Sequence, residues 1–225
     1  MRCWYKWIMW MYNRGYTQRF KLSTYQTLEM VFISCFFAVL FGLPLGVFLF
    51  VTRNAYLFKK PALHFTLGFV VNMVRSVPFI ILLVAITPFT RLIVGTSIGT
   101  VAAMVPLAVS AIPFLARLVE SALNEVPIGL IEASLAMGAT LFQIVRKVLI
   151  PEARATIVRG VTLTLITLVG YSAMAGAIGG GGLGNVAIMY GYERFEIGVM
   201  IATVVILIVM VQLVQWIGDW VASSV

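Results

Sequence analysis

One short motif in the C-terminal half resembles the nucleophile turn of a serine hydrolase. Residues Gly170 to Met174 read Gly-Tyr-Ser-Ala-Met, so the serine is present, but Met174 stands where the second glycine of Gly-x-Ser-x-Gly belongs. The only histidine, His64, lies near the start of an earlier apolar run, whereas Ser172 lies toward the end of a later one. We expect these two side chains on opposite sides of a membrane and therefore predict no catalytic residue.

Glycines and cysteines also occur at positions that could bind cofactors or metals. Gly179, Gly181 and Gly184 match Gly-x-Gly-x-x-Gly, but they follow an apolar helix, whereas a dinucleotide-binding turn follows a strand. We interpret this run as a flexible, outward-facing loop. No Gly-x-x-x-x-Gly-Lys-Ser/Thr sequence is present, and Cys3 and Cys35 lack partners at metal-ligand spacing. The chain itself is therefore expected to bind neither a cofactor nor a metal.

The segment with the clearest pattern, residues 117–160, lies between two apolar runs and is too polar to cross a bilayer. Pro127 predicts the start of a short helix and Gly138 its end, following the preference for proline first and glycine last at helix termini. Apolar residues recur at helical spacing between them: Ile128, Ile131 and Leu135. We predict a short amphipathic helix that rests on the membrane surface.

A second helix is expected directly after the glycine turn. Thr140 and Gln143 have the spacing of a capping box, in which each side chain satisfies a backbone N–H at the start of the helix. Pro151 predicts that this helix ends nearby. Residues 127–151 thus form a helix–turn–helix segment.

The composition indicates that most of the remaining chain has a lipid bilayer as its solvent. Of its 225 residues, 61% are hydrophobic and 11% are charged, whereas about a quarter of the residues of a soluble domain are charged. Several basic residues flank apolar runs. We therefore attribute the net charge of +8 to lipid headgroups and membrane orientation, and we expect no nucleic-acid partner.

Five apolar runs approach or exceed the roughly 20 residues that a membrane helix needs, so we predict an all-α integral membrane protein. The predicted spans are 27–51, 62–87, 98–116, 157–178 and 197–217. Residues 1–23, which mix basic and aromatic side chains, are expected at the membrane interface. Residues 24–217 then form the transmembrane domain, and residues 218–225 a short C-terminal tail.

The polar segment resembles a motif of the inner-membrane permeases of ABC importers: Glu-Ala-Ala, three residues, Gly, nine residues, Ile-x-Leu-Pro. Here Glu132-Ala133-Ser134 is followed after three residues by Gly138, and after nine more by Val148-Leu149-Ile150-Pro151. The departures are conservative in size. The resemblance implies the type I importer permease fold and a cytoplasmic coupling segment at 127–151. It also implies a set of ATPase-coupling residues: Glu132, Ala133, Ser134, Gly138, Ala139 and Pro151.

Longer stretches, from about Thr27 onward, are similar to the methionine branch of these permeases. They are Arg75 to Leu83, Pro88 to Arg91 with Val94 to Gly99, Leu130 to Thr140 apart from Leu135, and Leu165 to Met174. This similarity implies transport of methionine, including D-methionine and derivatives, across the bacterial inner membrane. Another amino acid is the first alternative. An ion-coupled secondary transporter is weaker, because no Asp or Glu lies near the middle of a predicted span.

Five helices are too few to enclose a transport route, so we expect a second copy of the chain. The resemblance implies further partners: an ABC ATPase dimer, which uses ATP and Mg²⁺ on the cytoplasmic side, and a periplasmic or lipid-anchored methionine-binding protein on the other. Intramembrane charges usually face the interior of a bundle. We therefore take six residues as candidates for the translocation pathway: Arg75, Ser76, Pro78, Tyr171, Ser172 and Met174.

The coupling segment also predicts the topology of the chain. With that segment inside, five spans place the N-terminus outside and the C-terminus inside. The basic residues do not decide the matter, because the inside loops would hold eight of them and the outside seven. The prediction therefore depends on the motif.

Overall fold

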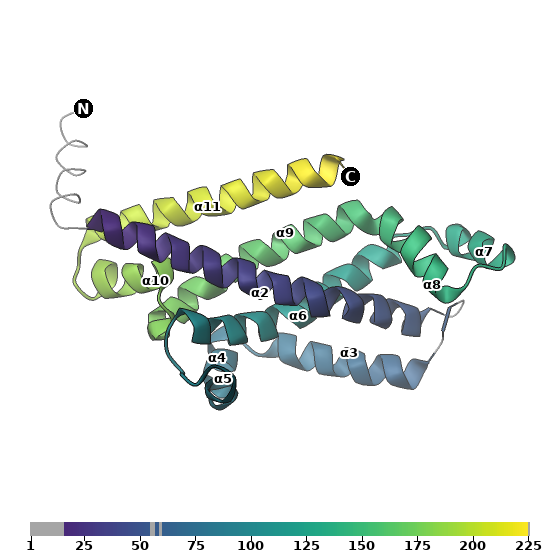
Figure 1. Ribbon diagram of the computed structural model, residues 1–225, viewed down its shortest axis with the longest axis horizontal. Helices are drawn as coiled ribbons and strands as arrows, with labels where there is room; N and C mark the ends of the chain where they lie inside the picture. Colours follow the sequence, from purple (N-terminus) through teal and green to yellow (C-terminus); the bar gives the residue numbers. More distant parts are fainter. Residues whose placement is uncertain (1–15, 55–56, 59, 225) are drawn as a thin grey trace. The chain divides into compact units, whose positions relative to one another are not determined.

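The computed structural model describes residues 16–54, 57–58 and 60–224 (Figure 1). Every regular element within these residues is a helix. In chain order they are α2 (Tyr16–Arg53), α3 (Pro61–Ser76), α4 (Phe79–Ala85), α5 (Thr87–Val94), α6 (Thr100–Asn124), α7 (Ile128–Ala136), α8 (Leu141–Ile144), η1 (Val145–Leu149), α9 (Ile150–Ala175), η2 (Gly176–Gly180), α10 (Gly182–Val186), η3 (Ala187–Tyr192) and α11 (Ile197–Ser224). The elements η1 and η3 are π-helical turns, whereas η2 contains a kink, with non-helical backbone at Ile178 and Gly179. The predicted all-α class is confirmed.

The residues group into two compact units. Unit 1 comprises the chain up to Ser34 with Phe79–Leu107 and Thr167–Leu213. Unit 2 comprises Cys35–Pro78, Ala108–Ile166 and Val214–Val225. Since the unit boundaries fall inside α2, α6, α9 and α11, each of these long helices contributes to both units.

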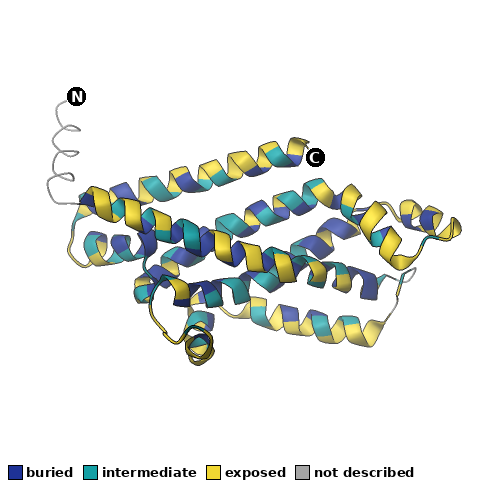
Figure 2. Cartoon of the chain, in the orientation of Figure 1, coloured by how far each residue is buried: buried dark blue, intermediate teal, exposed yellow. Residues whose placement is uncertain are grey.

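Four helical stretches among the described residues are long and apolar enough to cross a membrane: Tyr16–Arg53, Thr100–Asn124, Leu141–Gly180 and Ile197–Ser224. The pair α3 and α4 brings the number to five if it counts as one broken span. Three of the five predicted apolar runs fall within these elements, and the other two, 62–87 and 98–116, overlap them and extend two residues beyond. Exposed residues recur along α11 (Figure 2). They include Trp216 and Trp220, which are 71% and 67% exposed, as expected for a helix surrounded by lipid or by another protein.

The second predicted span, 62–87, is not one continuous helix. Helix α3 ends at Ser76, Val77 adopts an extended conformation with φ −80° and ψ 125°, and α4 begins at Phe79. Pro78 explains the break. Its ring disfavours a helical conformation for Val77, and it has no N–H to continue the helical hydrogen bonds.

Several helices begin or end beyond the predicted limits. The first turns of α2 include residues 16–23 of the predicted interfacial segment, and residues 1–15 of that segment lie outside the described part. Residues 218–224, predicted as a tail, continue α11. Helix α6 ends at Asn124, whereas the predicted span ends at Ala116; in this extension Glu120 is buried and pairs with the half-buried Arg117.

In unit 2, α2 packs closely on α6 through two glycines. A β-carbon placed at Gly42 would lie 2.8 Å from the carbonyl oxygen of Ile112, and one at Gly46 would lie 2.5 Å from that of Ala116. Real β-carbons do not approach other atoms so closely. The Gly42–Gly46 pair therefore allows the backbones of the two helices to touch, as small residues four apart do in membrane helices.

In unit 1, the glycine run after α9 is a tight, well-packed turn, and our interpretation of it as a flexible loop is wrong. Gly179, Gly181 and Gly182 have φ between +73° and +90°, a region that favours glycine. The N–H of Gly182 donates to Oε1 of Gln26 at 3.0 Å, and the N–H of Leu183 donates to Oγ1 of Thr27 at 2.9 Å. Side chains of α2 thus satisfy the first donors of α10, and the turn is held in place.

Candidate coupling site

Helix α7 in unit 2 contains three of the predicted coupling residues, Glu132, Ala133 and Ser134, and its two faces differ sharply in exposure. Ile131 and Ser134 are buried, at 1% and 5% exposed. The opposite face is exposed and carries Glu132 and Ala133 with apolar neighbours on either side: Ile128, Leu130, Leu135, Ala136 and Met137. Ile131, one of the apolar residues at helical spacing, is thus buried within this chain.

The turn after α7 is a Schellman motif centred on Gly138. The N–H of Ala139 donates to the carbonyl of Ser134 at 3.0 Å, and the N–H of Gly138 donates to that of Leu135 at 2.9 Å. Gly138 has φ +78°, and no atom lies within 4 Å of the position of a β-carbon there. Glycine is therefore favoured at Gly138 by its backbone conformation and not by lack of space. The predicted limits of this helix, Pro127 and Gly138, are confirmed.

The second helix starts as predicted, but it does not end at Pro151. Thr140 and Gln143 form both hydrogen bonds of a capping box at the start of α8. The chain then continues through the π-helical turn η1 directly into α9, and Pro151 lies in the first turn of α9. The N–H of Ile150 donates to the carbonyl of Val145, five residues back. This wider turn lets the helix pass Pro151, which cannot donate and would clash with the carbonyl four residues earlier.

The six coupling residues therefore occupy one continuous stretch of unit 2 with distinct local roles. Glu132 and Ala133 lie on the exposed face of α7, Ser134 lies on its buried face, and Pro151 is exposed. The hydroxyl of Ser134 donates to the carbonyl of Leu130 at 2.6 Å, which satisfies its proton within the helix. Gly138 and Ala139 form the turn. The arrangement presents a small, rigid, partly apolar surface without any catalytic group.

The candidate pathway residues fall in different environments. In unit 2, Arg75, Ser76 and Pro78 are exposed, and the guanidinium of Arg75 lies 5.9 Å from the centre of the Phe114 ring. In unit 1, Ser172 is buried and donates to the carbonyl of Val169 in its own helix at 2.7 Å, which is not the arrangement of an activated nucleophile.

The other two pathway candidates, Tyr171 and Met174, also lie in unit 1. Tyr171 is half-buried, and its ring stacks on that of Phe79 with 4.5 Å between ring centres. Met174 is 47% exposed. Because Tyr171 contacts the residue directly after the helix break at Pro78, the broken span and α9 meet at this point of unit 1.

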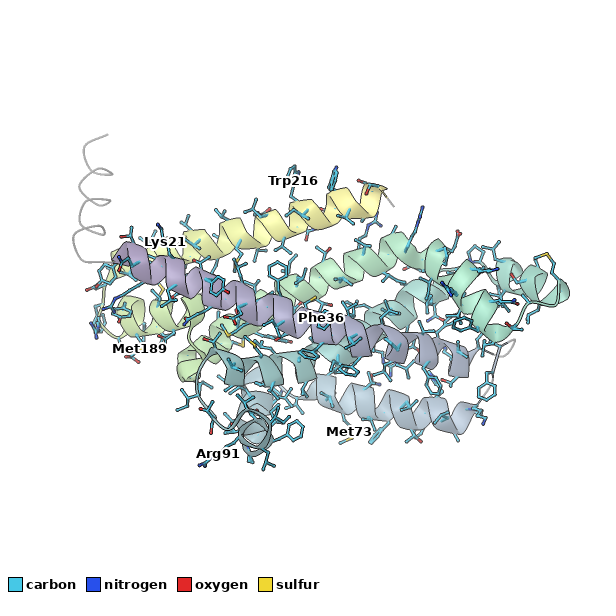
Figure 3. All side chains as sticks on the ribbon, viewed as in Figure 1. Lys21, Phe36, Met73, Arg91, Met189 and Trp216 are labelled. Atoms are coloured by element: carbon cyan, nitrogen blue, oxygen red, sulfur yellow. The ribbon has the colours of Figure 1, made fainter. Side chains whose placement is uncertain are left out.

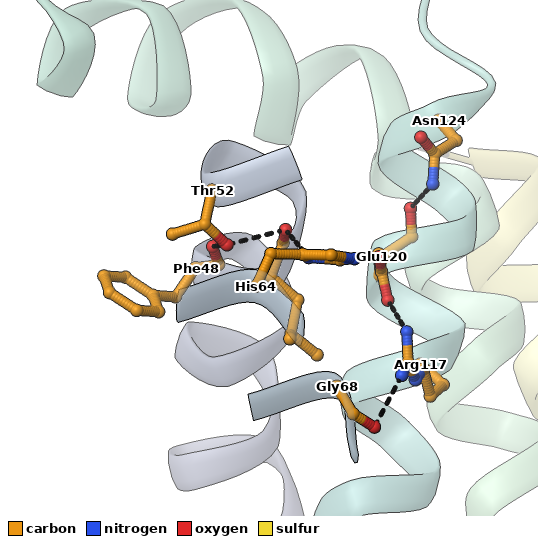
Figure 4. Close-up of polar contacts among 8 residues, drawn as sticks. Phe48, Thr52, His64, Gly68, Arg117, Glu120 and Asn124 are labelled. Carbon is orange, nitrogen blue, oxygen red and sulfur yellow. Dashed lines mark hydrogen bonds and ion pairs between the residues drawn. The ribbon is translucent and has the colours of Figure 1, made fainter. Parts of the chain in front are cut away.

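A buried charge pair in α6 was missed by the sequence reasoning (Figure 4). Glu120 is 3% exposed and accepts a hydrogen bond from Nη1 of Arg117 at 2.6 Å. Nη2 of Arg117 donates to the carbonyl of Gly68 in α3 at 2.9 Å. The spacing of three residues between Arg117 and Glu120 could have suggested a helical pair. We instead placed both outside the third span.

Comparison with known proteins identifies the family of the chain. Residues 38–225 match the family described as "Binding-protein-dependent transport system inner membrane component". The chain belongs to this family. It is therefore an inner-membrane transport component with several membrane-crossing helices, and the family and localisation predicted from the motif are confirmed.

Individual members of the family are closely similar to this chain. The probable D-methionine transport system permease protein MetI of Vibrio cholerae is 59% identical over 197 residues, which cover 88% of each protein. The D-methionine transport system permease protein MetI of Escherichia coli K12 is 57% identical over 169 residues, or 75% of this chain and 74% of that protein.

Solved structures give the same picture of the fold. A chain of the MetNI methionine ABC transporter, in an inward-facing conformation, has 52% sequence identity and a TM-score of 0.89 over 96% of this chain and 97% of that one. An amino acid ABC transporter solved with histidines has 20% identity and a TM-score of 0.78 over 96% and 98%. The second likeness shows a common fold only. Together they confirm the type I importer permease fold.

Proposed function

We propose that this chain is the permease subunit of an ATP-driven importer that moves methionine, including D-methionine, across the inner membrane. The element that carries the proposal is α7 with its Gly138 turn. It is held to its own chain by Ile131 and Ser134 and presents an exposed face of Glu132, Ala133 and neighbouring apolar residues. The names of the close relatives, D-methionine permeases, support the substrate.

The exposed face of α7 has the properties of a docking surface for a partner protein. Met137 is 81% exposed and Leu135 is 37% exposed, so apolar side chains stand out beside the carboxylate of Glu132. A contiguous apolar patch on a surface beyond the bilayer indicates a site of contact with a protein or a membrane. We assign this cover to an ABC ATPase subunit, which would hold ATP and Mg²⁺ itself. The MetNI structures, in which a similar chain belongs to an ABC transporter, support this assignment.

The transport route is proposed to lie between two copies of the chain. Arg75, Ser76 and Pro78 in one unit and Tyr171, Ser172 and Met174 in the other are our candidates for residues that line it. A methionine-binding protein would deliver substrate on the periplasmic side. ATP binding and release would then favour outward-facing and inward-facing states in turn, as alternating access requires.

Uptake by reconstituted vesicles tests the proposal directly. Vesicles that contain this chain, its ATPase and its binding protein should accumulate labelled D- or L-methionine only when ATP is present on the side of the membrane where the ATPase is bound. A Glu→Gln change in the catalytic site of the ATPase should abolish uptake and serves as control. Accumulation of another amino acid without methionine, or uptake that persists after ATP is removed, would reject the proposal.

A further inference from the structure

Unit 1 contains a cavity that none of the predicted pathway residues lines. Its volume is about 260 Å³, just below the roughly 300–1,000 Å³ of typical small-molecule sites. The apolar wall comes from three helices, α4, α6 and α9, together with η2: Leu83, Val84, Ala103, Pro106, Ala175 and Ile178. The cavity is thus of a size to hold one small molecule with an apolar portion.

Residues with hydroxyl groups also line this cavity. Thr87, Thr90 and Ser97 all line it. Thr90 is only 3% exposed, and its buried Oγ1 has no hydrogen-bond partner among the described residues. Burying an unpaired hydroxyl costs about 1–3 kcal/mol, so a group that pairs with Thr90 would be bound favourably.

A cation lies next to the hydroxyls. A second hollow, of about 600 Å³, shares Thr87 and Ser97 with the cavity and is also lined by Arg91. Figure 3 shows the Arg91 side chain extending away from α5. No carboxylate lies within ion-pair distance of Arg91 among the residues that the structure describes, and neither hollow is lined by Asp or Glu. Arg91 is therefore available to pair with an anion from outside the chain.

We propose that these two joined hollows form a substrate-binding site for an α-amino acid with an unbranched apolar side chain. Arg91 and the hydroxyl of Thr90 bind the carboxylate, since guanidinium and hydroxyl donors suit that group. The apolar cavity holds the side chain. A thioether fits such a cavity well, because it is flexible and polarizable. This inference rests on the proposed function, and it assigns a methionine site to the permease itself.

The test uses the accessibility of a cysteine placed in the site. The permease carries Cys3→Ser, Cys35→Ala and a new Ser97→Cys, and it is purified as a complex with its ATPase. The new thiol is alkylated with a maleimide in the absence of nucleotide and binding protein. Methionine at millimolar concentration should slow the alkylation, and so should norleucine. Methioninamide, which lacks the carboxylate, should not. Thr96→Cys is the matched control, because Thr96 is exposed but lines neither hollow.

Two further changes separate binding from folding. Thr90→Val keeps the size of the side chain and removes the unpaired buried hydroxyl. It should leave thermal stability unchanged or raise it, yet increase the methionine concentration for half-protection by roughly 10-fold or more. Arg91→Met should increase that concentration by roughly 10- to 100-fold. Loss of protection without loss of stability is the expected result.

The outcomes distinguish this inference from the proposed function. Wild-type vesicles of the same preparation that fail to import methionine would reject the proposed function. If those vesicles import methionine but methionine does not protect Ser97→Cys, the proposed binding site is wrong. It is also wrong if methionine protects Ser97→Cys equally well with and without the Thr90→Val or Arg91→Met change. In either case the hollows hold only solvent. Equal protection of Thr96→Cys would also overturn it, because the effect would not be local.

Discussion

At the residue scale, two glycines within apolar helices differ in a way that composition alone does not reveal. Gly46 lies in the middle of an apolar helix, where glycine weakens helix propensity, yet its α-hydrogens face the carbonyl of Ala116 and the side chain of Val119. By contrast, Gly170 in α9 has no atom within 4 Å of its β-carbon position. The two positions look alike in sequence, and only packing separates them.

Gly46→Ala should therefore destabilise the chain, whereas Gly170→Ala should not. The new methyl group would lie 2.7 Å from Cβ of Val119, so α2 must move from α6 at a cost of about 1–3 kcal/mol. Gly170→Ala should be neutral or stabilise by up to about 1 kcal/mol. Unfolding of the purified chain by SDS measures both. Equal effects of the two substitutions would show that the contact at Gly46 is unimportant.

The pair Arg117–Glu120 gives a second prediction for single residues. Arg117→Leu leaves the buried Glu120 without its partner and should destabilise by about 3–5 kcal/mol in the same unfolding experiment. The double variant Arg117→Leu/Glu120→Leu removes both charges and should recover much of that loss. A double variant as unstable as the single one would mean that the side chains act through packing and not as an ion pair.

At the scale of elements, the sequence predicted those features that depend on neighbours along the chain. Pro127, Gly138 and the capping box at Thr140 set the limits of helices by local chemistry, and all appear in the structure. The missed features depend either on a contact with a distant segment or on a rare backbone turn. The glycine run is rigid because Thr27 in α2 caps α10, and Pro151 is accommodated because η1 precedes it. Neither relation follows from local propensity.

Because Thr27 in α2 caps the start of α10, removal of its hydroxyl should lower the stability of the chain markedly. Thr27→Val should leave the N–H of Leu183 buried without a partner and cost about 1–3 kcal/mol, detected as a lower unfolding midpoint. Thr24→Val is the control. The hydroxyl of Thr24 donates only to the carbonyl of Phe20 in its own helix, so its loss should cost less than about 0.5 kcal/mol. If both variants behave alike, the cap contributes nothing to stability.

The turn that ends α7 should affect coupling more than stability. Gly138→Ala introduces a side chain at φ +78°, which costs about 1–2 kcal/mol although space is free. We expect α7 to shift on its ATPase, so that ATP hydrolysis continues while methionine uptake falls. Asn tolerates this backbone region better, so Gly138→Asn should retain more uptake. Gly129→Ala, within α7 and also in free space, is the control and should leave uptake unchanged. If Gly138→Ala imports as much methionine per ATP hydrolysed as the unchanged chain, the docking role of α7 is not supported.

At the scale of the whole molecule, two observations bear on the topology of the chain: the proposed coupling role of α7 and the distribution of basic residues. If α7 meets an ATPase, it lies in the cytoplasm, and five crossings then place residue 1 in the periplasm. The five basic residues before Thr24 work against this, because such charges are usually retained inside. We expect the topology that follows from a cytoplasmic α7 and five crossings, because the charge count is nearly even and decides nothing by itself.

Native Cys3 allows this topology to be measured without a fusion. A membrane-impermeant maleimide added to cells with a permeable outer membrane should label Cys3, while Cys35, which is buried, should stay unlabelled. A Cys3→Ser/Ser223→Cys variant places a thiol near the exposed end of α11 and should react only after the inner membrane is opened. Labelling of Cys3 only after that opening would place both ends of the chain inside. The broken span of α3 and α4 would then be re-entrant, because four crossings return the chain to its starting side.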